Sequence, residues 1–263
     1  MPSTSLPPPI LTALSQSAFS DIRLLATDMD GTLTTAGNFT PALLQAFEAL
    51  GAAGIDVMIV TGRSAGWVSG LVNYLPVVGA IAENGGLYIS KSDPQPLILP
   101  DIPKLSSHRD RLSSLFERLR VRRPQLKPAL DNAYRITDWT FDIDGLLRAD
   151  FDQMQEICAA LHFGFTYSTV QCHLKLDRQN KAAGLRKVLA QQFPDLTMAN
   201  VVTVGDSPND ESLFDPAQFP CSVGVANIAH YLPALAHAPA YVTPSSEGAG
   251  FIELVEKILG AIA

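Results

Sequence analysis

Short runs of apolar residues alternate along this chain with segments of helical pattern, and this alternation constrains the fold more than any other feature of the sequence. The apolar runs are residues 22–27, 57–60, 77–82, 201–204 and 221–225. Helices are expected after the Thr40 and Pro41 pair, at 65–75, at 181–192 and from about 249. Apolar runs of this length are typical of strands buried on both faces of a sheet. Strands and helices in this order predict a parallel sheet with helices on both faces.

A segment of different character interrupts this pattern. Between about 87 and 172 the sequence is rich in charges and broken by prolines. Residues 139–144 alternate strictly between apolar and polar, which predicts an antiparallel strand, and 163–170 is its expected partner. We therefore predict an α/β fold with a Rossmann-like, doubly wound core and an inserted α+β cap. The expected boundaries are a tail at 1–20, a core at 21–88 and 173–263, and a cap at 89–172.

The charge balance and the cysteines exclude several classes of protein. The chain has 26 acidic and 19 basic residues, a net charge of −7. This acidity argues against a non-specific nucleic-acid binder, which needs basic residues to neutralise phosphates. No stretch reaches the ~18–20 apolar residues of a membrane span, and the first residues lack the pattern of a secretory signal. Three scattered cysteines predict free thiols, so we expect a soluble cytoplasmic protein.

Carboxylates follow two of the predicted strands at the point where each strand ends. Asp28 and Asp30 follow the first strand in the sequence DMDGT, and Asp206 and Asp210 follow 201–204 in the sequence GDSPND. Ligands of open α/β sheets bind at the carboxyl ends of the strands, so we expect both sets at one edge. Clustered carboxylates repel one another unless a cation lies between them, and Mg²⁺ prefers oxygen ligands. The sequence therefore predicts a Mg²⁺ site at this edge.

Groups that bind phosphate are expected at the same edge. The second strand ends at Thr61, Gly62 and Arg63, which place a hydroxyl and a guanidinium beside the tip of the first strand. Lys181 follows Asn180, a residue that favours a helix start, and its ammonium group is suited to bind a phosphate. A divalent cation and a lysine together neutralise the oxygens of a phosphoryl group during its transfer.

Four motifs in this order resemble the signatures of the haloacid dehalogenase superfamily: DMDGT, Thr61 of VTGR, Lys181, and GDSPND. The insertion begins just after the sequence ENGG at 83–86, a position similar to that in the type IIB branch of Cof-like and sugar phosphatases. The resemblance covers about residues 21–90 and 173–260, and it implies a cap of the C2B type over the site. Pro208 stands where sucrose phosphatases usually have glycine, so the motifs leave the precise substrate open.

The resemblance implies a role for each motif. Asp28 would be the nucleophile that forms an aspartyl-phosphate, and Asp30 would protonate the leaving oxygen and then activate water. The ligands of Mg²⁺ would be the side chains of Asp28 and Asp206 and the backbone carbonyl of Asp30. Asp210 would support Lys181 or the metal ligands. The phosphoryl group would be bound by Thr61, Gly62, Lys181 and Asn209.

These residues together predict a Mg²⁺-dependent phosphatase that hydrolyses a small phosphorylated sugar or a related metabolite. Arg63, Glu83 and Asn84 flank the expected site and are candidates for contacting the substrate beyond its phosphate. Transfer of the phosphoryl group to a second sugar uses similar chemistry, and the sequence leaves this alternative open. The sequence does not indicate the oligomeric state.

Two further functions remain as alternatives. Residues 62–66 match the GxSxG motif of serine esterases, between a predicted strand and helix, with Ser64 as the nucleophile. The esterase interpretation leaves DMDGT and GDSPND unexplained, and a simpler role for Ser64 is to cap the following helix. The second alternative is a protein that binds a phosphorylated metabolite without hydrolysing it. Three experiments separate these functions. A phosphatase loses activity when the metal is chelated, an esterase loses activity in Ser64→Ala, and a binding protein turns over no member of a broad panel of phosphate esters.

Overall fold

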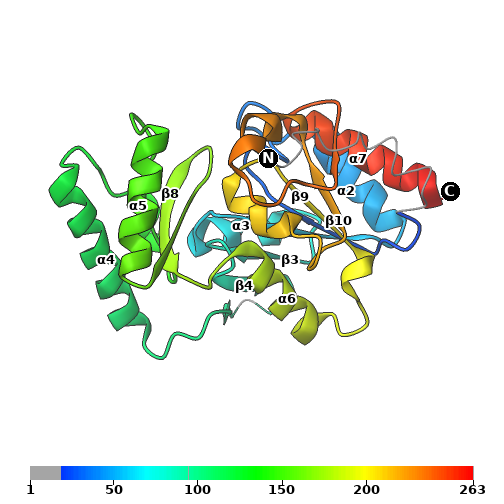
Figure 1. Cartoon of the computed structure of the whole chain (residues 1–263). Coiled ribbons are helices and arrows are strands. Elements are labelled where there is room, and N and C mark those ends of the chain that lie inside the picture. Colours follow the sequence, from blue (N-terminus) through cyan, green and yellow to red (C-terminus); the bar gives the residue numbers. More distant parts are fainter. Residues whose placement is uncertain (1–18, 94, 263) are drawn as a thin grey trace.

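The computed structural model describes residues 19–93 and 95–262 of the chain. Most of the expected N-terminal tail, residues 1–18, lies outside this range, whereas Phe19 is fully buried in the core. Figure 1 shows a larger part around an eight-stranded sheet and a smaller part that contains α4, α5 and β8. In the described ranges, no helix is both long and apolar enough to cross a membrane.

The core is built on one sheet with the strand order β11-β10-β9-β1-β2-β3-β4-β5. The strands from β11 to β3 are parallel to their neighbours, and β4 and β5 add antiparallel pairs at one edge. β1 is buried at every position, as the centre of a sheet covered on both faces requires. The predicted α/β class is confirmed. The strands are β1 Leu24–Thr27, β2 Asp56–Val60, β3 Gly79–Ala82, β4 Leu87–Ser90, β5 Leu97–Ile98, β9 Val201–Gly205, β10 Cys221–Gly224 and β11 Tyr241–Val242.

Helices cover both faces of this sheet. The helices α2 (Pro41–Ala52), α3 (Ala65–Tyr74) and α7 (Glu247–Ile262) pack in one hydrophobic cluster. The opposite face is covered by α6 (Lys181–Gln192) and the 3₁₀ helix η3 (Pro208–Phe214).

The start of α6 is fixed by a side-chain cap. The Asn180 side chain accepts a hydrogen bond from the backbone N of Ala183 at 2.8 Å, as an N-cap residue does. Lys181 is therefore held as the first residue of the helix. The expected bounds of this helix, 181–192, agree with the structure.

The strand order reverses at β1. From β1 the chain continues through β2 and β3 toward one edge, and after the cap it returns to β9 on the other side of β1. Thr27, the last residue of β1, lies opposite Ile59 of β2 and Val204 of β9. Such a reversal opens a crevice outside the carboxyl ends of the strands. Asp28 and Asp206 are the first residues after β1 and β9.

The cap is a three-stranded antiparallel sheet with the order β6-β8-β7, and α4 and α5 cover the face that points away from the core (Figure 1). Phe116, Phe141 and Leu174 belong to its apolar cluster, which lies on the helix side. Along β8, the alternate residues Gln171, His173 and Lys175 lie on the other face. The elements are α4 Leu105–Arg122, η1 Leu130–Tyr134, β6 Trp139–Asp142, α5 Arg148–Ala160, β7 Phe163–Tyr167 and β8 Gln171–Leu176.

Three details of the cap correct the sequence-based expectations. Residues 163–170 do not pair with 139–144, because β8 lies between β6 and β7. The expected boundary at 88/89 cuts β4, which pairs with β3 in the core sheet. The boundary at 172/173 cuts β8, which belongs to the cap sheet. The cap therefore begins after β5 and ends after β8, and its two connections to the core, 99–101 and 176–179, line one cavity of about 470 Å³.

Candidate active site

Lys181 joins two carboxylates at the carboxyl edge of the core sheet. Its Nζ donates hydrogen bonds to Oδ1 of Asp28 at 2.5 Å and to Oδ1 of Asp210 at 2.6 Å. Asp28 follows β1, Lys181 begins α6 and Asp210 belongs to η3, so three separate elements meet at one ammonium group. All three side chains are buried. The structure thus brings together three residues that the sequence placed in the site.

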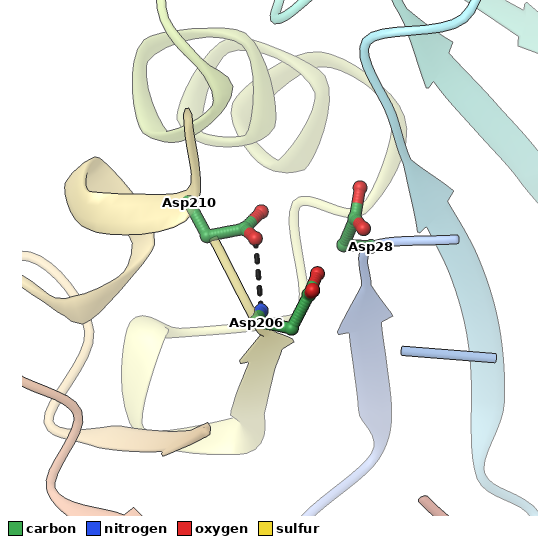
Figure 2. Close-up of side chains that lie close together, drawn as sticks. All are labelled: Asp28, Asp206 and Asp210. Carbon is green, nitrogen blue, oxygen red and sulfur yellow. Dashed lines mark hydrogen bonds between the residues drawn. The ribbon is translucent and has the colours of Figure 1, made fainter. Parts of the chain in front are cut away.

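Asp206 completes a group of three buried carboxylates. Figure 2 shows Asp28 and Asp206 at the ends of their strands with Asp210 beside them. One oxygen from each of the three lies within 4.8 Å of the others. Oδ2 of Asp210 accepts hydrogen bonds from the backbone N of Asp206 at 3.0 Å and of Ser207 at 3.1 Å. Asp210 therefore orders the loop that carries Asp206, in addition to binding Lys181.

Two further side chains orient Asp206. Thr32 Oγ1 donates to its Oδ1 at 3.2 Å, and Asn227 Nδ2 donates to its Oδ2 at 2.8 Å. Asn227 also binds the backbone oxygen of Gly31 at 3.1 Å. Gly31 has a φ of +80°, and a Cβ at this position would lie 2.5 Å from Oδ2 of Asp206. The turn of the DMDGT motif therefore requires glycine.

The three carboxylates are only partly neutralised by the protein. Burial raises the pKa of Asp28 to about 7; Lys181 opposes this rise, and the charges of Asp210 and Asp30 add to it. Burial and the charges of Asp28 and Asp210 also hold the pKa of Asp206 well above its usual value. A group of oxygen ligands with excess negative charge fits a hard divalent cation such as Mg²⁺.

Asp30 lies apart from these carboxylates and binds Arg63. Oδ2 of Asp30 accepts a hydrogen bond from Nε of Arg63 at 2.8 Å, and Oδ1 accepts one from Nη2 at 2.6 Å. The guanidinium also lies over the ring of Trp67, 4.8 Å from its centroid. Arg63, expected to contact the substrate, is thus occupied by Asp30 in this arrangement, although both residues line the cavity beside Asp28.

A cavity of about 10 Å³ lies between the core and the cap. This volume is room for about one water molecule, so the cap hairpin between β7 and β8 closes over the site. Thr61 Oγ1 accepts a hydrogen bond from the backbone N of Arg63 at 3.1 Å, and Asn209 Nδ2 donates to Oδ1 of Asn84 at 3.0 Å. The cavity is lined by Asp28, Asp30, Thr61, Gly62, Arg63 and Asn209 from the core and by Ser168, Val170, Gln171 and His173 from the cap.

Glu83 does not fit the substrate-binding role expected from the sequence. Its buried carboxylate accepts hydrogen bonds from the backbone N of Ala65 at 3.0 Å, of Ile136 at 3.0 Å and of Thr137 at 2.6 Å. Glu83 and Asn84 both have positive φ values, +54° and +52°, a conformation uncommon outside glycine. Glu83 therefore connects the start of α3 to the cap, and its oxygens are already occupied.

Known proteins resemble this chain in sequence. A family model described as haloacid dehalogenase-like hydrolase matches residues 25–106. Phosphoglycolate phosphatase 1 of Saccharolobus solfataricus is 29% identical over 242 residues, which are 90% of this chain and 96% of that protein. These matches support the predicted resemblance to the haloacid dehalogenase superfamily. The motifs also predicted the class of phosphoric monoester hydrolase correctly.

Solved structures of lower identity share the fold of this chain. The sucrose-phosphatase of Synechocystis sp. PCC6803, solved with sucrose and phosphate, has a TM-score of 0.69 at 21% identity and covers 90% of this chain and 97% of its own. The C-terminal domain of C. albicans trehalose-6-phosphate phosphatase has a TM-score of 0.71 at 14% identity and covers 98% and 99%.

The geometry at Ser64 does not provide a serine-esterase site. Ser64 Oγ is buried and has no hydrogen-bond partner among the described residues, so no histidine there activates it. The expected capping role is also wrong. Ser64 stands at the N-cap position of α3 without a side-chain capping bond, and Glu83 binds the N–H of Ala65 instead.

Some residues of the site were not singled out in the sequence. Asn227 follows β10 and could have been noticed because it comes just after a predicted buried strand. Gln171 and His173 belong to the segment QCHLKL, whose alternation of polar and apolar residues is the pattern of a strand with one polar face. That pattern identifies the cap face that lies over the site.

Proposed function

We propose that this protein is a Mg²⁺-dependent phosphatase that hydrolyses a small phosphorylated sugar or related metabolite. The observation that carries this proposal is the buried Asp28 carboxylate, which lies at the reversal of the strand order and contacts Lys181 at 2.5 Å. A carboxylate beside an ammonium group is arranged to meet a phosphoryl group, because the lysine offsets the charge of its oxygens.

The proposed reaction has two steps. In the first, an oxygen of Asp28 bonds to phosphorus, the ester P–O bond breaks, and Asp30 gives its proton to the leaving oxygen. In the second, Asp30 takes a proton from water, the water oxygen bonds to phosphorus, and the bond to Asp28 breaks. Inorganic phosphate leaves and both carboxyl groups return to their first state. Asp30 must separate from Arg63 during this cycle, since the pair is bidentate in the closed arrangement.

The proposed metal ligands are the side chains of Asp28 and Asp206 and the backbone carbonyl of Asp30. When bound, Mg²⁺ supplies positive charge that offsets the charge on the phosphoryl oxygens. Asp210 binds Lys181 and the loop before it, so we assign it a supporting role. Lys181, Thr61 and Asn209 are the proposed contacts of the phosphoryl oxygens, and Gly62 allows the chain to approach them closely.

A phosphate-release assay tests the proposal. The purified protein is incubated with p-nitrophenyl phosphate, phosphoglycolate and a set of sugar phosphates, with Mg²⁺ or with EDTA. We expect release that requires Mg²⁺ and that falls by roughly 10³-fold or more in Asp28→Asn. Asp142→Asn is the matched control, because Asp142 begins the second DxDG sequence of the chain but is exposed on the cap. Release that persists in both EDTA and Asp28→Asn would overturn the proposal, and loss of activity in Ser64→Ala alone would favour the esterase.

A further inference from the structure

His173 of the cap forms a buried dyad with Asp138. Nδ1 of His173 lies 2.9 Å from Oδ2 of Asp138. The same carboxylate accepts hydrogen bonds from Nη1 of Arg135, at 2.9 Å to Oδ1 and 3.0 Å to Oδ2. All three side chains are buried. Arg135 also donates to the backbone oxygen of Gly62 at 2.9 Å, so the dyad is held against the core.

The other ring nitrogen of His173 is directed to the site. The ring lines the cavity that contains Asp28 and Thr61, and Nε2 has no hydrogen-bond partner within the described residues. A Cβ added to Gly62 would lie 3.1 Å from this Nε2. The same Cβ would lie 3.2 Å from Nδ2 of Asn84, a buried amide nitrogen without a partner in the described part of the chain. A free nitrogen from the cap and a free donor from the core therefore converge on Gly62.

The surroundings of His173 favour its neutral form. The charged groups that face it are Asp138, Arg135 and Lys175 in the cap and Asp28, Asp30 and Arg63 in the core. Burial, with Arg135 and Lys175, holds the pKa of His173 below its usual value although Asp138 opposes this. An ionised Asp138 fixes the proton of a neutral ring on Nδ1, as in other carboxylate–histidine pairs. Nε2 is then an acceptor, whereas Nδ2 of Asn84 is a donor.

A second cavity provides space beside this point. It measures about 300 Å³, within the range of small-molecule sites, and Asn209 lines both cavities. Most of the residues that line it are polar, among them Asn84, Thr166, Lys175, Glu211 and Ser212. Asn209 thus joins the small cavity beside Asp28, which His173 lines, to a larger space, which Asn84 lines and which can hold part of a substrate.

We propose that His173 and Asn84 recognise a hydroxyl group of the substrate, so that the preferred substrate is a hydroxylated phosphate ester, of the sugar or polyol class, and not phosphoglycolate. This inference rests on the proposed phosphatase function. A hydroxyl group donates to Nε2 and accepts from Asn84, which satisfies both atoms. The carboxylate of phosphoglycolate has no proton to donate and would face the lone pair of Nε2. Asp138 and Arg135 are positioning residues that act through His173.

The substrate preference of the unmodified protein is the first test. Glycerol 3-phosphate, ribose 5-phosphate and glucose 6-phosphate are compared with phosphoglycolate and p-nitrophenyl phosphate in Mg²⁺. We expect kcat/KM for at least one hydroxylated ester to exceed that for phosphoglycolate by about tenfold or more, because a site built for a hydroxyl rejects analogues that leave its polar groups unpaired. A higher kcat/KM for phosphoglycolate than for every hydroxylated ester overturns the inference while leaving the phosphatase function intact. No Mg²⁺-dependent hydrolysis of any ester overturns both.

Variants of the dyad test the mechanism of this preference. His173→Ala is expected to lower the ratio of kcat/KM between the best hydroxylated ester and p-nitrophenyl phosphate by about tenfold or more. His173→Gln, which keeps an acceptor, is expected to restore part of the ratio. Asp138→Asn donates to Nδ1, moves the ring proton to Nε2 and makes it a donor, so it should shift the preference toward phosphoglycolate by about tenfold. His230→Ala, at an exposed histidine of the core, is the control.

The variants also distinguish recognition from a structural role. Circular dichroism and urea unfolding establish that each variant is folded. Equal losses of kcat/KM for all esters in His173→Ala and no change of preference in Asp138→Asn overturn the inference. Where a variant does not fold, the inference is tested by the ratio of kcat/KM between hydroxylated esters and phosphoglycolate in the unmodified protein.

Discussion

The guanidinium of Arg63 binds both oxygens of the Asp30 carboxylate, at 2.6 and 2.8 Å. Arg63 lies 33 residues from Asp30 in the sequence, and the pair lines the cavity beside Asp28. Asp30 is the proposed acid and base of the reaction. A bidentate pair with an arginine orients a carboxylate and occupies both of its oxygens. The pair therefore sets the resting position of Asp30 in the closed arrangement.

Arg63→Met removes that orientation. We expect it to lower kcat/KM for p-nitrophenyl phosphate by about tenfold, and Asp30→Asn to lower it by roughly 10²–10⁴-fold. In the Asp30→Asn background, Arg63→Met should add little, because the two side chains act as one unit. The double-mutant cycle measures this directly. Arg118→Met, at an exposed arginine of α4, is the control, and independent effects of Arg63 and Asp30 would contradict the interpretation.

Lys181→Met leaves Asp28 and Asp210 without their shared cation. Breaking a buried ion pair by removing one partner costs about 3–5 kcal/mol, so the free energy of unfolding should fall by that order in EDTA. Phosphate release should fall by roughly 10²–10³-fold, since the lysine also offsets charge during transfer. Urea unfolding and the release assay measure the two effects. Lys127→Met, at an exposed lysine of the cap, should change neither quantity. Unfolding free energy and phosphate release equal to those of the unmodified protein in Lys181→Met would contradict this prediction.

Lys175 predicts a pH dependence of stability. Burial lowers its pKa to about 8, although Asp177 and Asp138 oppose this effect. Between about pH 8 and the unfolded value near 10.4, the unfolded chain binds more protons than the folded one, so the free energy of unfolding rises with pH. The contribution approaches about 1.4 kcal/mol per pH unit in that window. Lys175→Met should remove this contribution and Lys127→Met should keep it; equal slopes of unfolding free energy against pH in all three proteins would contradict the prediction.

Glu83→Gln tests the connection between core and cap. The Glu83 carboxylate accepts from the backbone of Ala65, Ile136 and Thr137, and an amide has one acceptor oxygen and turns its NH₂ group toward those N–H groups. Leaving buried donors unpaired costs about 1–3 kcal/mol each, so we expect a loss of about 2 kcal/mol or more in urea unfolding. Limited proteolysis should cut the segment around 136–138 faster. Glu156→Gln, on the exposed face of α5, is the control, and matched stability in the two variants would contradict this role.

The core and its carboxylates were predictable because their information is local. Each central strand of the parallel sheet is a short, mainly apolar run, and Asp28 and Asp206 follow their strands directly. Lys181 was also predictable, since Asn180 before it has the chemistry of an N-cap. Once the strand order is parallel, these residues have to meet at one edge.

The cap depends on relationships that are not local. The pairing of β6 with β8, and not with β7, is decided by hydrogen bonds between distant segments, and no residue of 163–170 reveals it. The role of Glu83 differs from the expected one because its carboxylate binds backbone N–H groups of α3 and of the cap, a connection that no pattern of residue types showed. The proposed role of His173 depends on Asp138, 35 residues away in sequence.

The two connections of the cap, 99–101 and 176–179, border the same cavity of about 470 Å³. The cap is thus an insertion whose two ends lie side by side on the core. The distance between these ends is set by the core and does not depend on the segment inserted between them. Gln179 Nε2 donates to the backbone oxygen of Glu83 at 2.7 Å, which places the exit of the cap next to the turn after β3. We therefore expect that a cap of another size or shape can be exchanged at these two points, and that the specificity of the protein can be altered without rebuilding the carboxylates that we propose for the chemistry.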